Sequence, residues 1–380
     1  MAFGRLNRVK VDPLAYNIGL IGESGVGKTT VINEMLLKLN NNNPQAALFI
    51  ETGHEDGADA IDGINSINCP EWSMDYDEAT NSAGFEDVID DILENKSTEY
   101  PDLRTVVVDT YDNLVKICEP YVVRLHNKLN PEKKVNTINS AFGGFGKGDD
   151  KIDELILEKL WDLKKVGVSF IIIGHTKVRD IVDATNGETY SQLTTNMSMK
   201  HFNAIKTKLH FLGVATLDRE FIKKKSGQKD LKKKDVLKNV ISKEARKITF
   251  RSDDYSVDSK SRFAEITPEI NLDADELIKA ITDAIKAEQS KSGKSFEETK
   301  KEQDQAREQR EEEIAQMLKA EKEKKDLEAV NEEIYQFIVD KKDDKTAILP
   351  ILKALKEHGL TSPKDITDMS LAKEILKLTK

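Results

Sequence analysis

The chain has 380 residues, with 58 Lys and Arg against 68 Asp and Glu, so its formal net charge is −10. This length allows one large α/β domain with appendages, since domains typically contain about 100–200 residues. The negative charge argues against nonspecific nucleic-acid binding by the whole surface, and no apolar run is long enough to span a bilayer. Cys69 and Cys118 lack the neighbours of a zinc site, so we expect a cytoplasmic protein with reduced thiols, no signal peptide and no membrane contact.

Short apolar runs rich in Val and Ile alternate with longer amphipathic stretches up to about residue 286. Continuous apolar runs indicate strands that are buried on both faces, and their alternation with helical stretches is typical of a sheet covered by crossover helices. We therefore predict an α/β fold with a central, mostly parallel sheet. Apolar residues at helical spacing between Asp149 and Lys165 predict one covering helix. The predicted strands are Asn17–Ile21, Ala46–Ile50, Thr105–Val108, Val168–Ile173 and Leu209–Ala215.

A complete phosphate-binding loop, or P-loop, follows the first predicted strand and precedes a predicted helix that opens at Thr30. The glycines let the backbone aim its N–H groups at phosphate oxygens, and Lys28 adds a point charge at the β- and γ-phosphates. The Thr29 hydroxyl is the expected protein ligand of Mg²⁺ on this loop. We predict that the loop and Thr30 bind ATP. The loop residues are Gly22, Glu23, Ser24, Gly25, Val26, Gly27, Lys28 and Thr29.

Acidic and polar residues follow three other predicted strands. Asp109 ends the strand at 105–108, where a carboxylate can hold Mg²⁺ opposite the loop. Hydrolysis also needs a group that activates water. Glu55 is the preferred candidate and Glu51 the alternative, because both follow the strand at 46–50. His175 follows the strand at 168–173, where a polar side chain can sense a γ-phosphate.

This order of elements resembles the RecA-like branch of P-loop ATPases, especially the short RecA-related ATPases of bacteriophages that accompany single-strand annealing and recombination. The resemblance covers roughly residues 14–285. Its markers are the acidic residue after the second strand, matched by Glu51 or Glu55, and the polar residue that ends the fourth strand, matched by His175. It implies a RecA-like fold, ATP and Mg²⁺ as cofactors, and action on single-stranded DNA in phage-type recombination, annealing or replication, in the host cytoplasm.

Two segments resemble the DNA-binding loops of that family. The glycine-rich run at 143–148 is no second P-loop, because it lacks the Gly-Lys-Ser/Thr ending and no strand precedes it. Phe145 and Lys147 suit base stacking and phosphate neutralisation there, with a plain surface turn as the alternative. The segment 180–197, expected to be flexible, takes the place of the second loop and leads to Lys200 and Lys206.

A basic stretch from residue 221 to residue 247 contains eleven Lys and Arg against three acidic residues. Each phosphate that such a stretch neutralises releases counterions and strengthens nucleic-acid binding. We predict that Lys232, Lys233 and Lys234 contact DNA, whereas the alternative is a solvated basic hairpin.

Lys260 and Arg262 occupy alternate positions of a late strand-like segment, so their side chains are expected on one face. RecA-like enzymes carry a pair of basic residues at this spacing and insert them into the nucleotide site of the neighbouring subunit. The resemblance therefore implies a homo-oligomer, either a ring or a filament, in which these residues assist catalysis. A surface strand with solvated charges is the alternative.

The composition changes after residue 286. Residues 287–326 are Glu, Lys, Gln and Arg with scarcely any apolar side chains, which predicts a charged tether, either helical or disordered. Residues 327–380 return to helical periodicity, which predicts a small helical domain. A protein partner that this domain recruits is a separate expectation, tied to the assembly-protein alternative below. The predicted ATPase domain is 1–286.

Two other functions fit the same motifs. The protein is either a DNA-stimulated ATPase, as the resemblance implies, or a helicase-like motor, or a nucleotide-gated assembly protein that does not bind DNA. Displacement of a DNA strand would identify the helicase-like motor. An ATPase rate that DNA does not change would identify the assembly protein.

Overall fold

The computed structural model describes residues 8–53, 57–183, 186–229, 235–252, 256–291, 293, 295–342 and 344–379. For the strand residues within 220–243 it describes the backbone alone. The chain divides into two compact units, Met1–Glu308 and Gln309–Lys380.

The first unit is built on a sheet that contains ten strands among the described residues. Along its main path the order is β10, β8, β7, β1, β5, β4, β2 and β3, while β6 pairs with β5 and β9 pairs with β7. The strands are β1 (Ile18–Gly22), β2 (Ala47–Thr52), β3 (Ser66–Cys69), β4 (Thr105–Asp109), β5 (Ser169–Val182), β6 (Thr189–Thr195), β7 (Phe211–Lys229), β8 (Asp235–Thr249), β9 (Lys260–Ser261) and β10 (Glu269–Asn271).

The centre of this sheet is parallel. β1 pairs in parallel with β5 and β7, β4 with β5 and β2, and β2 with β3, whereas β6, β8, β9 and β10 pair antiparallel at the margins. The prediction of an α/β fold with a central, mostly parallel sheet is confirmed, because each predicted strand corresponds to one of these parallel strands. All their carboxyl ends consequently lie at one edge of the sheet.

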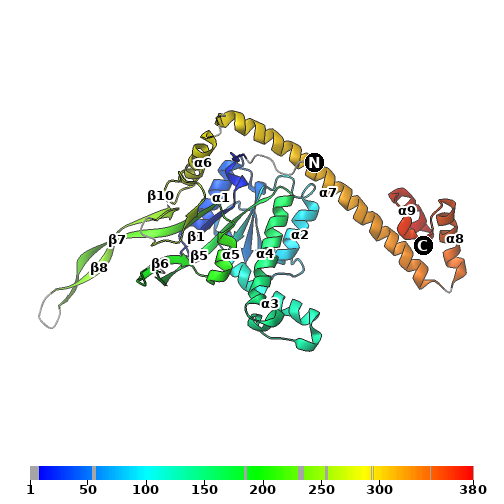
Figure 1. The fold of residues 1–380 in the computed structure, drawn as a ribbon, viewed down its shortest axis with the longest axis horizontal. Helices are drawn as coiled ribbons and strands as arrows, with labels where there is room; N and C mark the ends of the chain where they lie inside the picture. The colour runs from blue at the N-terminus through cyan, green and yellow to red at the C-terminus, as the bar shows by residue number, and fades with distance from the viewer. Residues whose placement is uncertain are drawn as a thin grey trace. The chain divides into compact units, whose positions relative to one another are not determined.

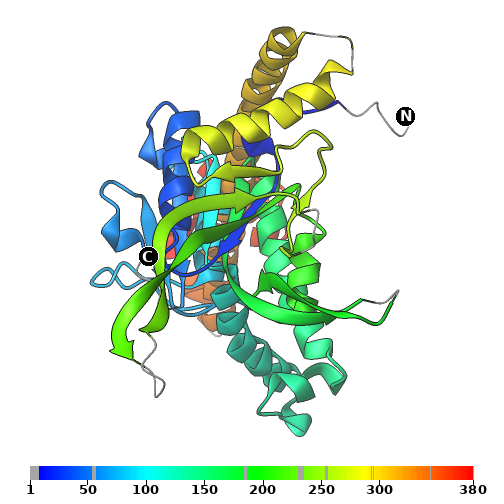
Figure 2. The same cartoon turned by 90° about the vertical axis from the view of Figure 1, so that its left-hand side faces the viewer.

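Helices cover both faces of the sheet (Figures 1 and 2). One face carries α1 and α6, and the other carries α2, α3, α4 and α5. The predicted helix at 149–165 corresponds to α4. The bounds are α1 (Lys28–Leu39), α2 (Phe85–Asn95), α3 (Tyr111–Leu129), α4 (Lys147–Lys165), α5 (Met199–Lys206) and α6 (Ala274–Ser290).

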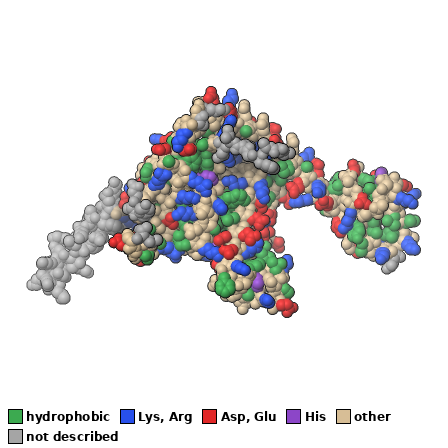
Figure 3. All heavy atoms as spheres, in the orientation of Figure 1, with side chains coloured by type: hydrophobic (Ala, Val, Ile, Leu, Met, Phe, Trp, Pro, Cys, Tyr) green, Lys and Arg blue, Asp and Glu red, His purple; other side chains and the backbone are tan. Residues whose placement is uncertain are grey.

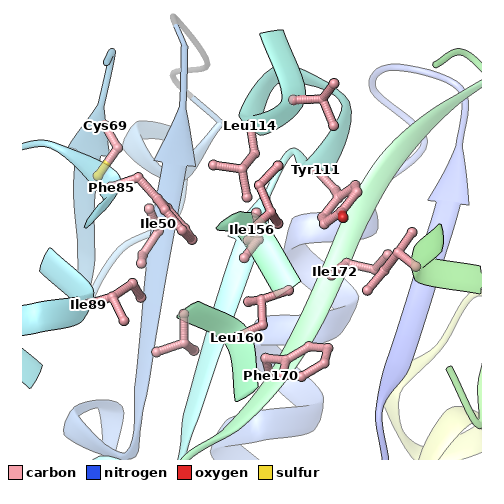
Figure 4. Close-up of a cluster of buried hydrophobic side chains, with 14 of the residues drawn as sticks. Ile50, Cys69, Phe85, Ile89, Tyr111, Leu114, Ile156, Leu160, Phe170 and Ile172 are labelled. Atoms are coloured by element: carbon pink, nitrogen blue, oxygen red, sulfur yellow. The ribbon is translucent and has the colours of Figure 1, made fainter. Parts of the chain in front are cut away.

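Two hydrophobic clusters, one on each face, hold these layers together. Figure 4 shows part of the larger cluster, in which Phe85 from α2 and Phe170 from β5 are fully buried. Full burial of such a side chain contributes about 1.5–3 kcal/mol. Cys69 and Cys118 belong to the same cluster, and both are free thiols with no exposed surface.

β7 and β8 form a long antiparallel hairpin that continues past the parallel part of the sheet (Figure 1). Val214 pairs with Thr249 inside the sheet, and Lys229 pairs with Asp235 at the far end of the described strands. Most of the basic stretch at 221–247 lies in this hairpin, so the sequence places its charge on strands that extend away from the core.

The segment 180–197 was predicted to be flexible, but its described residues include the end of β5 and all of β6. The end of β5 pairs with β6 from Thr176–Thr195 to Val182–Thr189. Both strands are largely polar and half exposed here, so they lack the continuous apolar run that marks a buried strand.

The second unit contains the end of α7 (Phe296–Asp340), α8 (Lys345–Glu357) and α9 (Met369–Leu376). Ile334, Ile351 and Ile375, one from each helix, meet in its own small core. The C-terminal helices expected from the sequence are therefore present, while the predicted boundaries at 286 and 326 stay predictions. No helix of the described residues is long and apolar enough to cross a membrane.

Candidate functional site

The loop between β1 and α1 has the backbone that its glycines allow. Gly25 and Gly27 adopt left-handed φ values of +74° and +106°, a region that L side chains rarely occupy. Gly22 needs its missing side chain for another reason, since a Cβ there would lie 2.6 Å from the Ala215 carbonyl oxygen on β7. α1 begins directly after the loop, at Lys28. The first N–H groups of this helix therefore face the loop, which is the arrangement that binds phosphate.

The Lys28 side chain folds back over the loop. It is only 6% exposed, and its Nζ donates hydrogen bonds to the carbonyl oxygens of Gly22 at 3.2 Å and Glu23 at 2.9 Å. These bonds hold a positive charge beside backbone donors. Such a set of groups fits the phosphate chain of a nucleotide.

Thr29 and Asp109 meet at the carboxyl edge of the sheet. The Thr29 hydroxyl donates a 2.6 Å hydrogen bond to Oδ2 of Asp109, the last residue of β4. Among the described residues no group of three or more His, Cys, Asp or Glu gathers to hold a metal ion. One hydroxyl and one carboxylate suit Mg²⁺, which keeps several waters and takes its other ligands from substrate phosphates.

Glu51 lies at the same edge, near the end of β2. Its carboxylate is 3% exposed and accepts a 2.7 Å hydrogen bond from the backbone N–H of Ala58. A methyl group on Gly57 would lie 3.8 Å from Thr29 Oγ1 and 3.9 Å from Glu51 Oε1, so Glu51 faces the Thr29 side of the site. Glu55, the preferred candidate from the sequence, lies outside the described residues.

The carboxyl ends of β2 and β4 are tied to one another. The Thr52 hydroxyl donates a 2.6 Å hydrogen bond to the Thr110 carbonyl oxygen, and a cis peptide bond joins Asp109 to Thr110. The Gly53 N–H is bonded to the Cys69 carbonyl of β3 at 3.0 Å. These bonds fix the two strand ends that present Glu51 and Asp109.

His175 has a partner that the sequence analysis missed. Asp112, in the first turn of α3, accepts hydrogen bonds from the backbone N–H and from Nδ1 of His175, each at 3.2 Å. Burial opposes ionisation of Asp112, but the hydrogen bonds and charge of His175 outweigh it and hold the pKa of this carboxyl below its usual range. The sequence signal for Asp112 was its position three residues after Asp109. The first turn of α3 places the Asp112 side chain over the ends of the strands.

Lys260 and Arg262 lie at the opposite edge of the sheet. β9 pairs with the beginning of β7, at the amino end of the parallel strands. Lys260 Nζ donates a 2.6 Å hydrogen bond to the Lys206 carbonyl, and Arg262 Nη2 donates one of 2.5 Å to the Thr207 carbonyl. Both charges point to the C-terminal end of α5, where cations are favoured. Their action on a neighbouring subunit stays a prediction.

The glycine-rich run at 143–148 joins a 3-10 helical segment to α4, which begins at Lys147. Phe145 is fully exposed and has a left-handed φ of +53°. The ring is thus open to a planar partner such as a nucleic-acid base, although a single exposed apolar side chain is ordinary on a protein surface. Figure 3 shows hydrophobic, acidic and basic side chains intermixed on the face in view.

Lys200 brings the two predicted DNA loops together. Its ammonium lies at the N-terminal turn of α4, 2.7 Å from Asp150, and donates a 2.5 Å hydrogen bond to the Gly146 carbonyl. Lys206 forms an ion pair with Asp258. Both lysines are thus partly neutralised by carboxylates. Lys232, Lys233 and Lys234 lie outside the described residues.

A protein family described as an AAA domain matches residues 14–263 of the chain. No curated protein matches it. Among solved structures, 113 chains match this protein. One of them is the crystal structure of a KaiC-like protein from the hyperthermophilic archaeon Pyrococcus horikoshii OT3. The two are 13% identical over 62% of this chain and 77% of that chain, with a TM-score of 0.27. That superposition is too distant to carry any further conclusion. The family match and the order of the strands confirm the predicted RecA-like P-loop fold.

Proposed function

The chain belongs to the AAA domain family, and from this premise we propose that it hydrolyses ATP with Mg²⁺, binds single-stranded DNA, and acts in phage-type DNA recombination, annealing or replication. The observation that carries the proposal is the contact of Thr29 with Asp109 beside the loop that Lys28 covers. Lys28 and Thr29 follow β1 and Asp109 ends β4, and these strands lie on either side of β5, so only the folded sheet brings the groups together.

Each residue at this edge has a role in hydrolysis. Lys28 and the loop N–H groups bind the β- and γ-phosphates, while Thr29 and Asp109 are the protein ligands of Mg²⁺. The metal neutralises negative charge that develops on the phosphates. Glu51 or Glu55 orients the attacking water and accepts its proton.

His175 is proposed to report on the γ-phosphate. Its ring is held by Asp112 and comes from β5, between the strands that carry the loop and Asp109. Asp112 acts here as a positioning residue, because it fixes the ring through the backbone N–H and Nδ1 together.

The DNA part of the proposal rests on the surface around the glycine-rich run. The fully exposed ring of Phe145 suits stacking on a base, and Lys147 suits a phosphate contact. The basic stretch at 221–247 adds a second region of positive charge on the hairpin. A homo-oligomer, ring or filament, would place Lys260 and Arg262 beside a second nucleotide site.

Two observations favour the assembly protein instead. Lys200 and Lys206 are paired with Asp150 and Asp258, which reduces the charge they offer to phosphate. The second unit also exposes Leu349 and Leu352 on α8, two apolar side chains that a protein partner would cover.

The deciding experiment measures the ATPase rate with and without single-stranded DNA over a series of salt concentrations. We expect DNA to raise the rate, with an effect that weakens steeply as salt increases, because phosphate contacts release counterions. A rate that DNA does not change at low salt would favour the assembly protein. Strand displacement on a forked duplex would identify the helicase-like motor.

A further inference from the structure

Arg246 lies beside the phosphate loop, on a strand that no sequence motif connects with it. In β8, Ile248 pairs with Ala215 of β7, which in turn pairs with Gly22 of β1. Arg246 comes two residues before Ile248 and pairs with Leu217 of β7, two residues past Ala215, so it sits just beyond the carboxyl edge of the parallel sheet. Alternate strand residues share a face. Ile248 packs with α1 and α6, which places Arg246 on the α1 face as well.

The distance from the guanidinium to the loop is short. A Cβ on Gly27 would lie 3.5 Å from Arg246 Nη1 and 3.4 Å from Leu272 Cδ2. The backbone at this point is fixed, because the Leu272 N–H donates a 2.9 Å hydrogen bond to the Arg246 carbonyl. Asp273 then caps α6 by accepting hydrogen bonds from the N–H groups of Asp275 and Glu276.

Within the described part of the chain the charge of Arg246 is also uncompensated, in contrast to that of Lys247. Arg246 is exposed, and within the described part of the chain its guanidinium makes no hydrogen bond or ion pair. Lys247, on the other face of β8, pairs with Asp218 at 3.1 Å and with Glu269 at 2.7 Å. A guanidinium offers five donors in a fork that matches phosphate oxygens, so its position against an anion-binding loop is a specific arrangement.

The strand order indicates which part of a nucleotide Arg246 would meet. Thr29 and Asp109 place the metal and the terminal phosphate on the side of β1 that carries β5, β4 and β2. The rest of the nucleotide must extend to the other side, toward β7 and β8. We propose that Arg246 is a nucleotide-binding residue that contacts the α- and β-phosphates shared by ATP and ADP. This inference rests on nucleotide binding at the loop and is independent of the proposed DNA role.

The test is nucleotide binding by full-length Arg246→Ala protein, titrated with a fluorescent ADP analogue and with a non-hydrolysable ATP analogue. Loss of one charge-assisted contact should weaken both affinities by the same factor, about 10–100-fold. Arg246→Lys keeps the charge but loses the fork, and should give an intermediate affinity. Lys247→Ala is the matched control, because it removes a charge from the opposite face and should leave both affinities unchanged.

Unchanged ADP affinity in Arg246→Ala protein with an unaltered melting temperature would overturn the proposal. So would a loss confined to the ATP analogue, since that places Arg246 at the γ-phosphate. A loss of single-stranded DNA affinity with normal nucleotide affinity would assign Arg246 to the basic hairpin instead. If wild-type protein binds ADP but its ATPase ignores DNA, the DNA role fails while this inference stands.

Discussion

The Thr29 hydroxyl and the Asp109 carboxylate are 2.6 Å apart, although Thr29 follows β1, Asp109 ends β4, and β5 lies between these two strands. The contact is possible because the loop leans from β1 across the end of β5 toward β4. The contact therefore depends on the assembled edge of the sheet, and it places both side chains where they can bind Mg²⁺.

Asp109→Asn should make hydrolysis depend on much higher Mg²⁺ concentrations and lower the maximal rate about 10²–10³-fold, as expected for loss of a preorganised charge at the reacting phosphates. ADP binding in the presence of EDTA should be unchanged, because the metal is then absent from both proteins. The measurement is ATPase rate against Mg²⁺ concentration. An unaltered Mg²⁺ dependence would show that Asp109 does not face the metal.

Glu51→Gln should retain nucleotide binding and lose about 10²–10⁴-fold in rate, because the amide keeps a side-chain oxygen for Ala58 but cannot take a proton from water. The burial of Glu51 on the Thr29 side of the site supports this choice. Glu55→Gln, made in parallel, decides between the two acids. If only that variant is slow at normal affinity, Glu55 activates the water.

Arg262→Ala and Lys28→Ala proteins should each be nearly inactive alone and regain part of the activity when mixed. Mixed oligomers would contain interfaces that join an intact loop to an intact Arg262, and an arginine supplied in trans contributes about 10³–10⁵ in rate where it has been measured. The measurement is ATPase activity across a range of mixing ratios. Normal activity of Arg262→Ala protein across a dilution series would contradict a role in the neighbouring subunit. Arg262 would then have only its hydrogen bond to the Thr207 carbonyl as a role.

Neutralising Lys232, Lys233 and Lys234 to Gln should weaken single-stranded DNA binding about equally for all sequences. The slope of log affinity against log salt should flatten by up to ~2–3, since each lost phosphate contact removes a counterion release. The matched control makes the same three changes at Lys322, Lys324 and Lys325 of α7, outside the hairpin. Equal effects of the two triple variants would mean that only total charge matters.

Two histidines should make stability depend on pH in opposite senses. Burial tends to lower the pKa of His201, but its 2.7 Å hydrogen bond with Asp153 and the nearby carboxylates outweigh this and hold the pKa above the ordinary 6.5. Burial, with the charge of Arg262 second, lowers the pKa of His210 to about 4.

The contribution of His201 to stability is therefore fully present below pH 6.5 and is lost as pH rises through the raised folded-state pKa. That of His210 is present above pH 6.5 and is lost as pH falls toward about 4, because the unfolded chain then binds the proton more readily. Melting temperatures of His201→Gln and His210→Gln proteins against pH check both senses. Parallel pH profiles for wild type and both variants would contradict the assignment.

The sequence predicted the parts of the fold that are buried on both faces. β1, β4 and the first half of β5 are continuous apolar runs, and the loop motif fixed their order relative to α1. β3 is only four residues long, and most of it is half exposed, so it carries no such run. β6 is mostly polar, and it forms by pairing with β5 rather than from an apolar pattern of its own.

The sequence predicted the site residues that belong to a motif. It did not predict contacts between residues that are far apart in the chain. Lys28, Thr29 and Asp109 follow from strand, loop and acid. The partnership of His175 with Asp112 depends on how α3 turns back over β4, and that of Arg246 with Gly27 depends on the register of the β7–β8 hairpin. The place of Asp112 three residues after Asp109 marks one partner of the first pair, but neither pairing can be read from a single segment of the sequence.

Because both thiols are buried, the folded protein should not react with thiol reagents. Burial raises the pKa values of Cys69 and Cys118 well above the usual range, and neither sulfur reaches the surface. The sequence contains no other cysteine. A single cysteine introduced at a fully exposed position such as Phe145 would therefore accept a fluorophore selectively, and would turn the glycine-rich run into an optical reporter without any background labelling.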